Sequence, residues 1–237
     1  MKYKAVIFDL FGTLVDNFSL QEYDSVLNEM ISILKAPHDE FFALWYQAGK
    51  SLSVGKFRTL EDNLKFISRE LNVSFTPSQI QCACNVRVDP VKLMDFVARA
   101  MAPKPDAMET LARLKSDGYK IALLSNCDTE PPVTWPRTPF APYFDATIFS
   151  STCGLEKPDP RIYRLATEKL GVKAEVCLYI GDGNNNELTG AAEAGMRPVL
   201  IRHPDEGNVY PLRSGEYEGG SWNGEVISSL KEVLELL

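Results

Sequence analysis

The sequence predicts an α/β fold in which a parallel sheet is interrupted, after its first strand, by an all-helical module. Two patterns of apolar residues along the chain support this prediction. From about residue 102 onward, short apolar runs alternate with amphipathic segments, which is the pattern of successive β-α-β units. Between about residues 17 and 100, apolar residues keep helical spacing. We therefore expect residues 1–16 and 101–237 to form the α/β core and residues 17–100 to form the helical module.

Five short apolar segments are the expected strands of the core. Each is continuous rather than alternating and is bounded by turn signals, as expected for strands buried on both faces of a parallel sheet. The segments are residues 4–8, 120–124, 146–149, 176–180 and 198–201. Because β-α-β connections are right-handed and place helices on the faces of the sheet, we expect the sheet to lie between helical layers.

Helix signals separate these strands. Pro105 and Gly118 bound one predicted helix, because proline suits the first turn of a helix and glycine its carboxyl end. Pro160 and Gly171 bound another in the same way. By contrast, residues 131–142 contain five prolines, so we expect a loop there rather than a long helix.

The helical module has its own start signals. Apolar residues recur at helical spacing over residues 20–34, and a second run of this kind follows Thr59. Residues 76–79, Thr-Pro-Ser-Gln, have the form of a capping box with proline at the first helical position. The dipeptide at residues 89–90, Asp-Pro, is expected to begin one more helix.

The bulk composition is that of an ordinary globular protein, with 45% hydrophobic and 24% charged residues. A net charge of −7 and scattered basic residues give no electrostatic signature of nucleic-acid binding. The sequence contains neither a signal-peptide pattern nor an apolar stretch of transmembrane length, so we expect no membrane association. The five cysteines lack the spacing of a disulfide framework, which favours reduced thiols and a cytoplasmic location.

Polar residues with related chemistry follow several of the expected strands. They are Asp9, Ser125 with Asn126, Lys157 after a loop, and Asp182 with Glu187. Because ligands of an open parallel sheet bind beyond the carboxyl ends of its strands, we expect these side chains to meet. A carboxylate nucleophile, a hydroxyl donor, a cation and acids that suit a hard divalent metal together favour phosphoryl transfer.

These segments resemble the four motifs of the haloacid dehalogenase-like (HAD) hydrolase superfamily, and the resemblance covers essentially the whole chain. The segments are Phe8-Asp9-Leu10-Phe11-Gly12-Thr13, Leu124-Ser125-Asn126, Lys157-Pro158-Asp159-Pro160-Arg161-Ile162-Tyr163, and Ile180-Gly181-Asp182 through Glu187. The resemblance implies a Rossmann-like parallel sheet core. It also implies that residues 17–100 are a helical-bundle cap that closes over the active site and selects the leaving group.

The resemblance further implies roles for residues of the first three motifs. Asp9 attacks the phosphorus and becomes a phospho-aspartate, Ser125 binds the phosphoryl group, and Lys157 offsets its negative charge. Thr13 and Asn126 are expected to contact the substrate. The implied activity is that of a phosphatase acting on a small phosphorylated metabolite, with the protein as a monomer or homodimer.

A magnesium ion is the cofactor that the resemblance implies. Asp9 and Asp182 are its expected side-chain ligands, the backbone carbonyl of Phe11 is a third, and Glu187 supports the metal site. Of these four residues, Phe11 departs from the family's pattern. The family's phosphatases usually carry an aspartate there, which protonates the leaving group and then activates water.

The absence of that second acid leaves three interpretations open. Such proton transfers are typically worth about 10²–10⁴-fold in rate each. In the first interpretation, the protein is a phosphatase whose substrate has a good leaving group, such as an acyl phosphate or anhydride, or whose missing acid is replaced by Asp16 or Glu22. In a second, the protein binds a phosphorylated ligand or partner with little catalysis.

The third interpretation is a 2-haloacid dehalogenase, because those enzymes also use a bulky aromatic residue at the position of Phe11. Tyr163, six residues after Lys157, fits that branch. Against it, the acids of the fourth motif keep a metal site that dehalogenases relax. In addition, Tyr46 stands near the place where those enzymes are expected to carry a halide-binding arginine.

Overall fold

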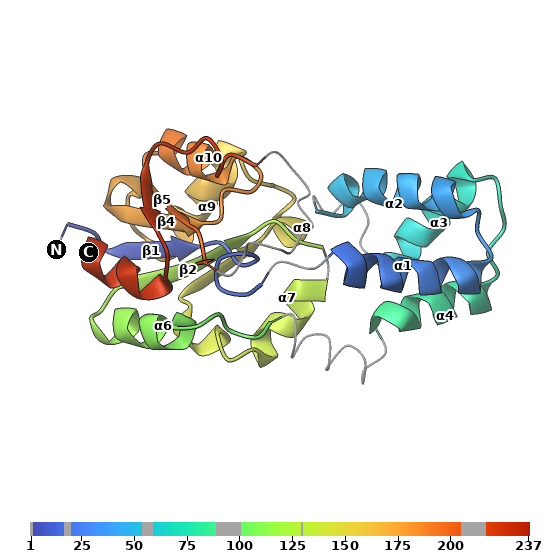
Figure 1. Ribbon diagram of the computed structural model, residues 1–237, viewed down its shortest axis with the longest axis horizontal. Helices are drawn as coiled ribbons and strands as arrows, with labels where there is room; N and C mark the ends of the chain where they lie inside the picture. Colours follow the sequence, from blue (N-terminus) through green and yellow to red (C-terminus); the bar gives the residue numbers. More distant parts are fainter. Residues whose placement is uncertain (1, 17–19, 54–58, 89–100, 129, 205–216) are drawn as a thin grey trace.

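The computed structural model describes residues 2–16, 20–53, 59–88, 101–128, 130–204 and 217–237. Within these residues, an α/β part built on one sheet lies beside a group of four helices (Figure 1). The predicted fold class, a parallel α/β sheet with an inserted helical module, is confirmed. None of the described helices combines the length and the apolar character that crossing a bilayer requires.

The sheet has six strands in the order β3-β2-β1-β4-β5-β6, and all neighbouring pairs are parallel. The strands are β1 (Ala5–Phe8), β2 (Lys120–Ser125), β3 (Ala146–Phe149), β4 (Cys177–Gly181), β5 (Arg197–Ile201) and β6 (Glu225–Ile227). Five of them coincide with the predicted segments. The sixth was not predicted, because β6 is three residues long and Val226 at its centre is exposed.

Strand β1 lies between β2 and β4, with Phe8 paired to Leu123 on one side and to Ile180 on the other. The chain crosses from one half of the sheet to the other at this point, which is the topological switch point of an open α/β sheet. Asp9 is the first residue beyond β1 and therefore lies at the middle of the carboxyl edge.

Alternate residues of β1 serve two hydrophobic layers, as the two-residue period of a strand requires. Val6 and Phe8 belong to a cluster with α6 (Ala107–Ser116) and the C-terminal 3₁₀ helix η5 (Leu230–Leu236). Ala5 and Ile7 belong to a second cluster with α9 (Pro160–Leu170) and α10 (Glu187–Glu193). Figure 1 shows α6 on one face of the sheet and α9 and α10 on the other.

The two core helices with strong sequence signals form as predicted. Helix α6 ends shortly before Gly118, whose φ of +84° terminates it. The side chain of Asp159 accepts a hydrogen bond from the backbone of Arg161 at the start of α9, and Gly171 ends that helix at a φ of +63°. Glycine adopts this left-handed conformation without the steric cost that a side chain adds.

The proline-rich segment differs from the predicted loop in one respect. No long helix forms, but short helical turns do: α7 (Glu130–Thr134), η1 (Trp135–Arg137) and η2 (Ala141–Tyr143). Proline occupies the first or second position of η1 and η2, where its missing N–H costs no helical hydrogen bond. The ring of Trp135 stacks on Phe140 and meets Phe149 edge-on, so the segment is anchored to the core.

The helical module consists of α1 (Leu20–Leu34), α2 (His38–Ser53), α3 (Leu60–Glu70) and α4 (Pro77–Val88). The predicted starts of α3 and α4 are confirmed. The Thr59 hydroxyl oxygen accepts a hydrogen bond from the Asp62 N–H at 3.1 Å. Thr76 and Gln79 bond each other's backbone N–H, which is the reciprocal pattern of a capping box. The helix expected from Asp89 lies outside the described residues.

The four helices enclose a hydrophobic cluster of their own, which includes the stacked rings of Phe41 and Trp45. Where the chain returns from the module, the Lys104 N–H donates to the Leu14 carbonyl at 2.8 Å. The segments on either side of the module therefore run beside each other. The domain boundaries at residues 16/17 and 100/101 stay a prediction, because residues 17–19 and 89–100 lie outside the described part.

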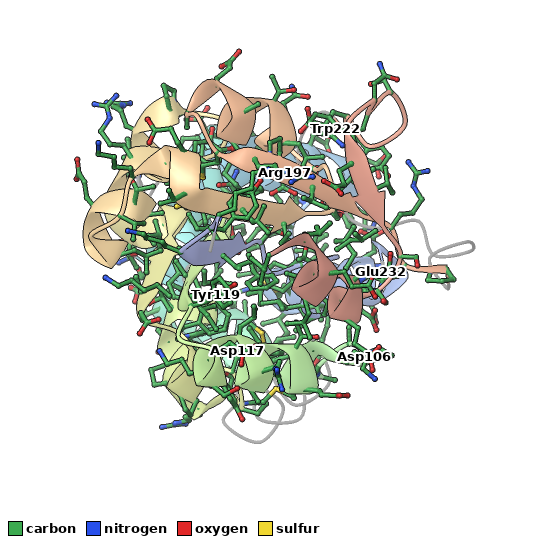
Figure 2. All side chains as sticks on the ribbon, turned by 90° about the vertical axis from the view of Figure 1, so that its left-hand side faces the viewer. Asp106, Asp117, Tyr119, Arg197, Trp222 and Glu232 are labelled. Carbon is green, nitrogen blue, oxygen red and sulfur yellow. The ribbon has the colours of Figure 1, made fainter. Side chains whose placement is uncertain are left out.

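Figure 2 views the α/β part from the end that lies away from the helical module, where Arg197 is labelled. Arg197 on β5 forms an ion pair with Glu225 on β6 and donates a hydrogen bond to the Tyr3 hydroxyl at 2.9 Å. These contacts tie the N-terminal segment and two strands together at the amino edge of the sheet. The opposite, carboxyl edge carries the predicted site residues.

Candidate active site

Asp9 is buried at the carboxyl end of β1, and both oxygens of its carboxylate are engaged. Its backbone N–H donates to the Ile180 carbonyl at 2.9 Å, which anchors the residue to β4. The chain then turns sharply at Gly12, whose φ is +83°, and this turn brings the hydroxyl of Thr13 back to Asp9 Oδ2 at 3.2 Å. Asp9 Oδ1 accepts from Lys157 Nζ at 2.5 Å.

Lys157 reaches the site from the loop before α9, and Asn126 fixes its backbone. The Asn126 carboxamide oxygen accepts from the Lys157 N–H at 2.8 Å, and its nitrogen donates to the Lys157 carbonyl at 3.1 Å. These two bonds hold the third predicted motif against the second. The carboxamide of Asn126 therefore shapes the site through Lys157, and its predicted contact with a substrate stays a prediction.

The ammonium of Lys157 has three acceptors. Its Nζ lies 2.5 Å from Asp9 Oδ1, 2.5 Å from Glu187 Oε2 and 3.2 Å from the hydroxyl oxygen of Tyr179. Burial alone would lower the pKa of this lysine, but the two adjacent carboxylates outweigh it and raise the pKa above its usual value. Lys157 therefore carries a fixed positive charge at neutral pH.

Glu187 is the first residue of α10, and its side chain extends over the backbone of Gly181. A Cβ at Gly181 would lie only 2.3 Å from Glu187 Oε1, so a side chain there would displace the carboxylate. Glu187 Oε2 accepts from Lys157 and from the Tyr179 hydroxyl at 2.6 Å, and Oε1 accepts from the Gly183 N–H at 3.0 Å. Burial raises the pKa of Glu187, and Lys157 opposes that effect.

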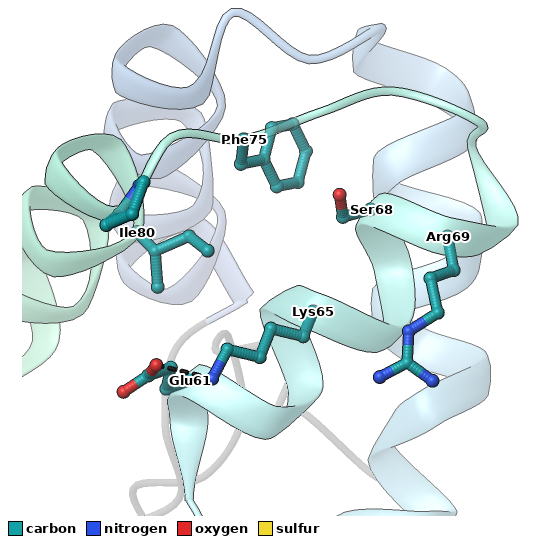
Figure 3. Close-up of a pocket in the computed structure, with 7 residues that line it drawn as sticks. Glu61, Lys65, Ser68, Arg69, Phe75 and Ile80 are labelled. Atoms are coloured by element: carbon teal, nitrogen blue, oxygen red, sulfur yellow. Dashed lines mark ion pairs between the residues drawn. The ribbon is translucent and has the colours of Figure 1, made fainter.

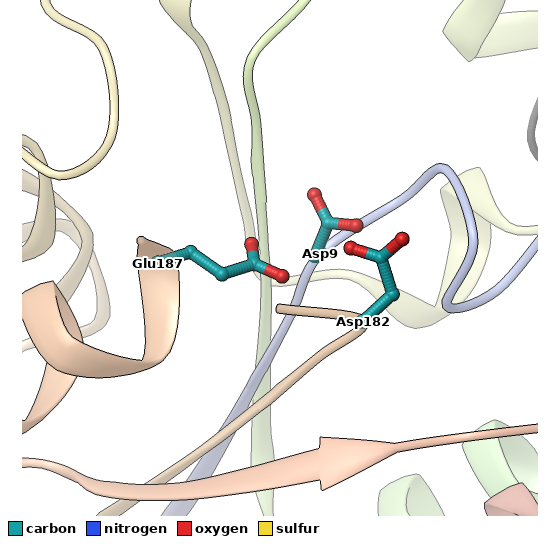
Figure 4. A group of neighbouring side chains, drawn as sticks. All are labelled: Asp9, Asp182 and Glu187. Atoms are coloured by element: carbon teal, nitrogen blue, oxygen red, sulfur yellow. The ribbon is translucent and has the colours of Figure 1, made fainter. Parts of the chain in front are cut away.

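Asp9, Asp182 and Glu187 form a compact group of buried carboxylates (Figure 4). One carboxylate oxygen from each lies within 4.8 Å of the others, so the three could hold a metal ion. Burial and the charge of Glu187 raise the pKa of Asp9 to about 6, although Lys157 counteracts them. Lys157 contributes one positive charge to these three carboxylates, and a hard divalent cation would balance the remaining negative charge.

Ser125 is the last residue of β2 and is fully buried. Its hydroxyl has no hydrogen-bond partner among the described residues, which is uncommon for a buried polar group. Ser150, by comparison, is equally buried and exchanges hydrogen bonds with the backbone of Cys127. The Ser125 hydroxyl is thus free to bond an anion that enters the site.

Phe11 follows Asp9 in the turn, and its half-buried ring packs against the hydrophobic cluster beneath that turn. Of the two residues predicted to replace the missing acid, Asp16 has a side chain that is 85% exposed and pairs with Lys104 at 2.8 Å. The side chain of Glu22 lies outside the described part of the chain. In the described part of the chain, therefore, no contact supports Asp16 or Glu22 as the replacement acid.

Tyr163 and Tyr46 occupy different surroundings. The hydroxyl of Tyr163 donates to the Glu187 carbonyl at 2.9 Å, and a Cβ at Gly190 would lie 2.6 Å from that hydroxyl. Tyr163 thus packs α9 tightly against α10. Tyr46 belongs to α2, where its hydroxyl donates to Asp24 at 2.8 Å.

Sequence reasoning missed two residues that support this site. Tyr179 lies within a predicted strand, and a buried tyrosine usually finds a partner for its hydroxyl, which is the signal that could have singled it out. Glu218 had no such signal. Its buried carboxylate accepts from the backbone N–H of Leu188 at 2.5 Å and from the Thr189 hydroxyl at 2.5 Å, which fixes the first turn of α10.

A separate hollow of about 390 Å³ lies in the helical module (Figure 3). It is lined by Glu61, Lys65, Ser68, Arg69, Phe75, Pro77 and Ile80. Glu61 and Lys65 form an ion pair of 2.6 Å at this hollow. The predicted site residues do not line it, so the carboxyl edge of the sheet remains the candidate active site.

Comparisons with known proteins identify a family and several relatives of this chain. A family model described as haloacid dehalogenase-like hydrolase matches residues 3–195. A glyceraldehyde 3-phosphate phosphatase of Pyrococcus furiosus is 23% identical over an alignment of 255 positions, gaps included, that covers 99% of this chain and 92% of that protein. The (S)-2-haloacid dehalogenase 4A of Burkholderia cepacia is 30% identical over an alignment of 224 positions, gaps included, that covers 89% of each chain.

One solved structure shows the same fold in the presence of ligands. It is a HAD family enzyme of Bacteroides thetaiotaomicron in complex with magnesium and inorganic phosphate. Its sequence identity is 18% and its TM-score 0.60, and the match covers 87% of this chain and 98% of that one.

Proposed function

The chain belongs to the haloacid dehalogenase-like hydrolase family, and on this basis we propose that it is a Mg²⁺-dependent phosphatase that acts on a small phosphorylated metabolite. The observation that carries the proposal is the pairing of buried Asp9 with Lys157 beside two further buried carboxylates. Relatives named as phosphatases, among them the Pyrococcus furiosus protein, support the substrate class.

Each residue of the site has a defined task in this proposal. A carboxylate oxygen of Asp9 forms a bond to phosphorus while the bond from phosphorus to the leaving group breaks, which gives an aspartyl phosphate. Water then forms a bond to this phosphorus while the bond from phosphorus to Asp9 breaks, so that inorganic phosphate leaves with the protons of the water and the Asp9 carboxylate is restored. Thr13 restrains the Asp9 carboxylate through its hydroxyl, so the nucleophile keeps one orientation. Lys157 remains protonated and stabilises the negative charge on the phosphoryl oxygens, and the unpartnered Ser125 hydroxyl bonds one of those oxygens.

The donor set at this edge fits magnesium. Mg²⁺ prefers oxygen ligands, and Asp9 and Asp182 would hold it through their carboxylates. The backbone carbonyl of Phe11 would be a third ligand, as the family resemblance implies. When bound, Mg²⁺ would supply charge stabilisation of the phosphoryl oxygens. Glu187 supports the site by anchoring Lys157, since Lys157, Tyr179 and Gly183 all donate hydrogen bonds to its carboxylate.

Phe11 narrows the substrate class. An alkyl phosphate needs a proton on its leaving oxygen, and the Phe11 side chain cannot supply one. Asp16 is exposed and pairs with Lys104, which does not favour it as the donor. We therefore favour a substrate whose leaving group departs without protonation, such as an acyl phosphate or an anhydride.

A 2-haloacid dehalogenase is the second candidate. The aromatic residue at position 11 and the relative of 30% identity favour it, because a halide needs no proton to leave. The preserved group of Asp9, Asp182 and Glu187 favours a metal-dependent phosphatase instead. Binding of a phosphorylated ligand with little turnover is the third candidate, and the missing acid at Phe11 is its only support.

A substrate screen separates the three candidates. The protein is assayed with phosphate esters, acyl phosphates and 2-haloacids, in each case with Mg²⁺ and with a chelator. Phosphate release that requires Mg²⁺ is the expected result. Halide release would establish the second candidate, and tight binding of phosphate analogues without turnover would establish the third.

A further inference from the structure

Tyr179 lies in the middle of β4 and is fully buried. Its ring belongs to the hydrophobic cluster under α9 and α10 and meets the ring of Tyr163 edge-on at 5.7 Å. Its hydroxyl lies among the charged residues of the candidate active site. A buried phenol in such a place needs hydrogen-bond partners, and Tyr179 has two.

The Tyr179 hydroxyl acts as donor and acceptor at once. It donates to Glu187 Oε2 at 2.6 Å and accepts from Lys157 Nζ at 3.2 Å. Burial and the charge of Glu187 keep the pKa of this phenol well above its usual value, so the hydroxyl stays neutral and protonated. Its role is therefore to hold neighbours in place rather than to transfer a proton.

An ammonium has three protons, and those of Lys157 have three acceptors arranged around Nζ: Asp9 Oδ1, Glu187 Oε2 and the Tyr179 hydroxyl. The two carboxylates supply negative charge, whereas the Tyr179 hydroxyl supplies the third hydrogen-bond acceptor for Nζ. Without this hydroxyl, Lys157 Nζ would be held only by Asp9 and Glu187. Two acceptors leave Nζ free to move about the line that joins them, because the lysine side chain is flexible. Water cannot readily take the place of the hydroxyl, because all of these groups are buried.

We propose that Tyr179 is a positioning residue that fixes Lys157 and Glu187 in the arrangement needed for phosphoryl transfer to Asp9. This inference rests on the proposed function and deepens it, because it adds a residue outside the sequence motifs to the phosphoryl-transfer site. Tyr179 acts through Lys157, which contacts the nucleophile directly, and through Glu187, which begins α10.

The test compares Tyr179→Phe with Tyr3→Phe. Each variant loses one hydroxyl from a buried tyrosine, but the Tyr3 hydroxyl accepts from Arg197 at the amino edge of the sheet, away from Asp9. Activity is measured as kcat and KM on the best phosphorylated substrate. A second readout needs no turnover: the affinity for beryllium fluoride with Mg²⁺, an analogue of the phosphoryl group on Asp9, is followed by ¹⁹F NMR.

For Tyr179→Phe we expect kcat to fall by about 10- to 100-fold, the usual effect of removing a residue that supports an active-site group, with KM changed less than kcat. Beryllium fluoride affinity should fall by about tenfold or more on the same ground. Tyr3→Phe should leave both quantities at the wild-type values. A Tyr179→Phe variant with wild-type kcat and wild-type beryllium fluoride affinity would overturn the inference.

Two further outcomes keep the test decisive. If Tyr179→Phe does not fold, a crystal structure of the wild-type protein with beryllium fluoride replaces it. The Tyr179 hydroxyl should then lie within hydrogen-bond distance of Lys157 and Glu187, and separation from both would overturn the inference. If the wild-type protein neither releases phosphate nor binds beryllium fluoride, the proposed function itself fails and the inference fails with it.

Discussion

Lys157 and Asp9 form a buried ion pair with 2.5 Å between Nζ and Oδ1, although 148 positions separate them in the sequence. The fold brings them together, because β1 pairs with β2 and Asn126, directly after β2, holds the backbone of Lys157. The pair does not stand alone, since the same ammonium also contacts Glu187 at 2.5 Å. The buried charges of Asp9, Lys157 and Glu187 are therefore mutually dependent.

Removal of the ammonium should destabilise the metal-free protein strongly. Lys157→Met leaves the buried carboxylates of Asp9 and Glu187 without their shared counter-charge, and breaking a buried pair in this way costs about 3–5 kcal/mol. The free energy of unfolding, measured by urea denaturation, is the observable. Lys115→Gln, which breaks a partly exposed pair with Asp145, is the control and should cost about 0.2–1 kcal/mol. Equal losses in the free energy of unfolding for the two variants would contradict the role of Lys157 as the buried counter-charge of Asp9 and Glu187.

Ser125→Ala should lower activity without lowering the stability of the fold. The Ser125 hydroxyl has no hydrogen bond among the described residues, so its loss should change the free energy of unfolding by less than about 0.5 kcal/mol. Activity should nevertheless fall by about tenfold or more, because a donor to the phosphoryl oxygens is lost. Ser150→Ala is the matched control and should cost about 1–3 kcal/mol, because it removes both hydrogen bonds between the buried Ser150 hydroxyl and the Cys127 backbone. A stability loss at Ser125 as large as that at Ser150 would show a structural role instead.

Phe11→Asp should raise turnover of alkyl phosphates. An aspartate at this position would supply the proton that an alkoxide leaving group requires, which is typically worth about 10²–10⁴-fold. The measurement is kcat for an alkyl phosphate, with an acyl phosphate as the control substrate that gains little. An unchanged kcat on both substrates would show that another group already donates the proton.

Magnesium should stabilise the folded protein by binding at the cluster of Asp9, Asp182 and Glu187. A ligand at 100 times its dissociation constant adds about 2.7 kcal/mol to the free energy of unfolding, so the unfolding temperature should rise with Mg²⁺ concentration. Asp182→Asn should remove most of this rise. Asp159→Asn, which alters a partly exposed cap of α9, should keep it. A full Mg²⁺ response in Asp182→Asn would exclude Asp182 as a metal ligand.

The sequence was most informative where local chemistry determines structure. Three elements depend on neighbours within a few positions: the strand that ends at Phe8, the helix bounded by Pro160 and Gly171, and the capping box at residues 76–79. Their outcome follows from hydrogen bonds and backbone preferences that the residues carry with them. These elements were predicted with nearly correct ends.

Contacts between segments that are distant in the sequence could not be predicted from it. The partners of Tyr179 depend on how α9 and α10 pack on β4, and Glu218 reaches the start of α10 from a segment 30 positions later. The carboxamide of Asn126 binds the Lys157 backbone, which neither motif shows by itself. The predicted cytoplasmic location and the monomeric or homodimeric state stay predictions.

The central claim is that Asp9 is the nucleophile of a Mg²⁺-dependent phosphatase. Its most direct test is phosphate release from an acyl phosphate by the wild-type protein and by Asp9→Asn, which keeps the side-chain shape but replaces the nucleophilic carboxylate with a neutral amide. We predict steady release by the wild-type protein with Mg²⁺ and loss of that release in the variant, with both proteins folded as judged by circular dichroism. Release by folded Asp9→Asn at the wild-type rate would contradict the claim.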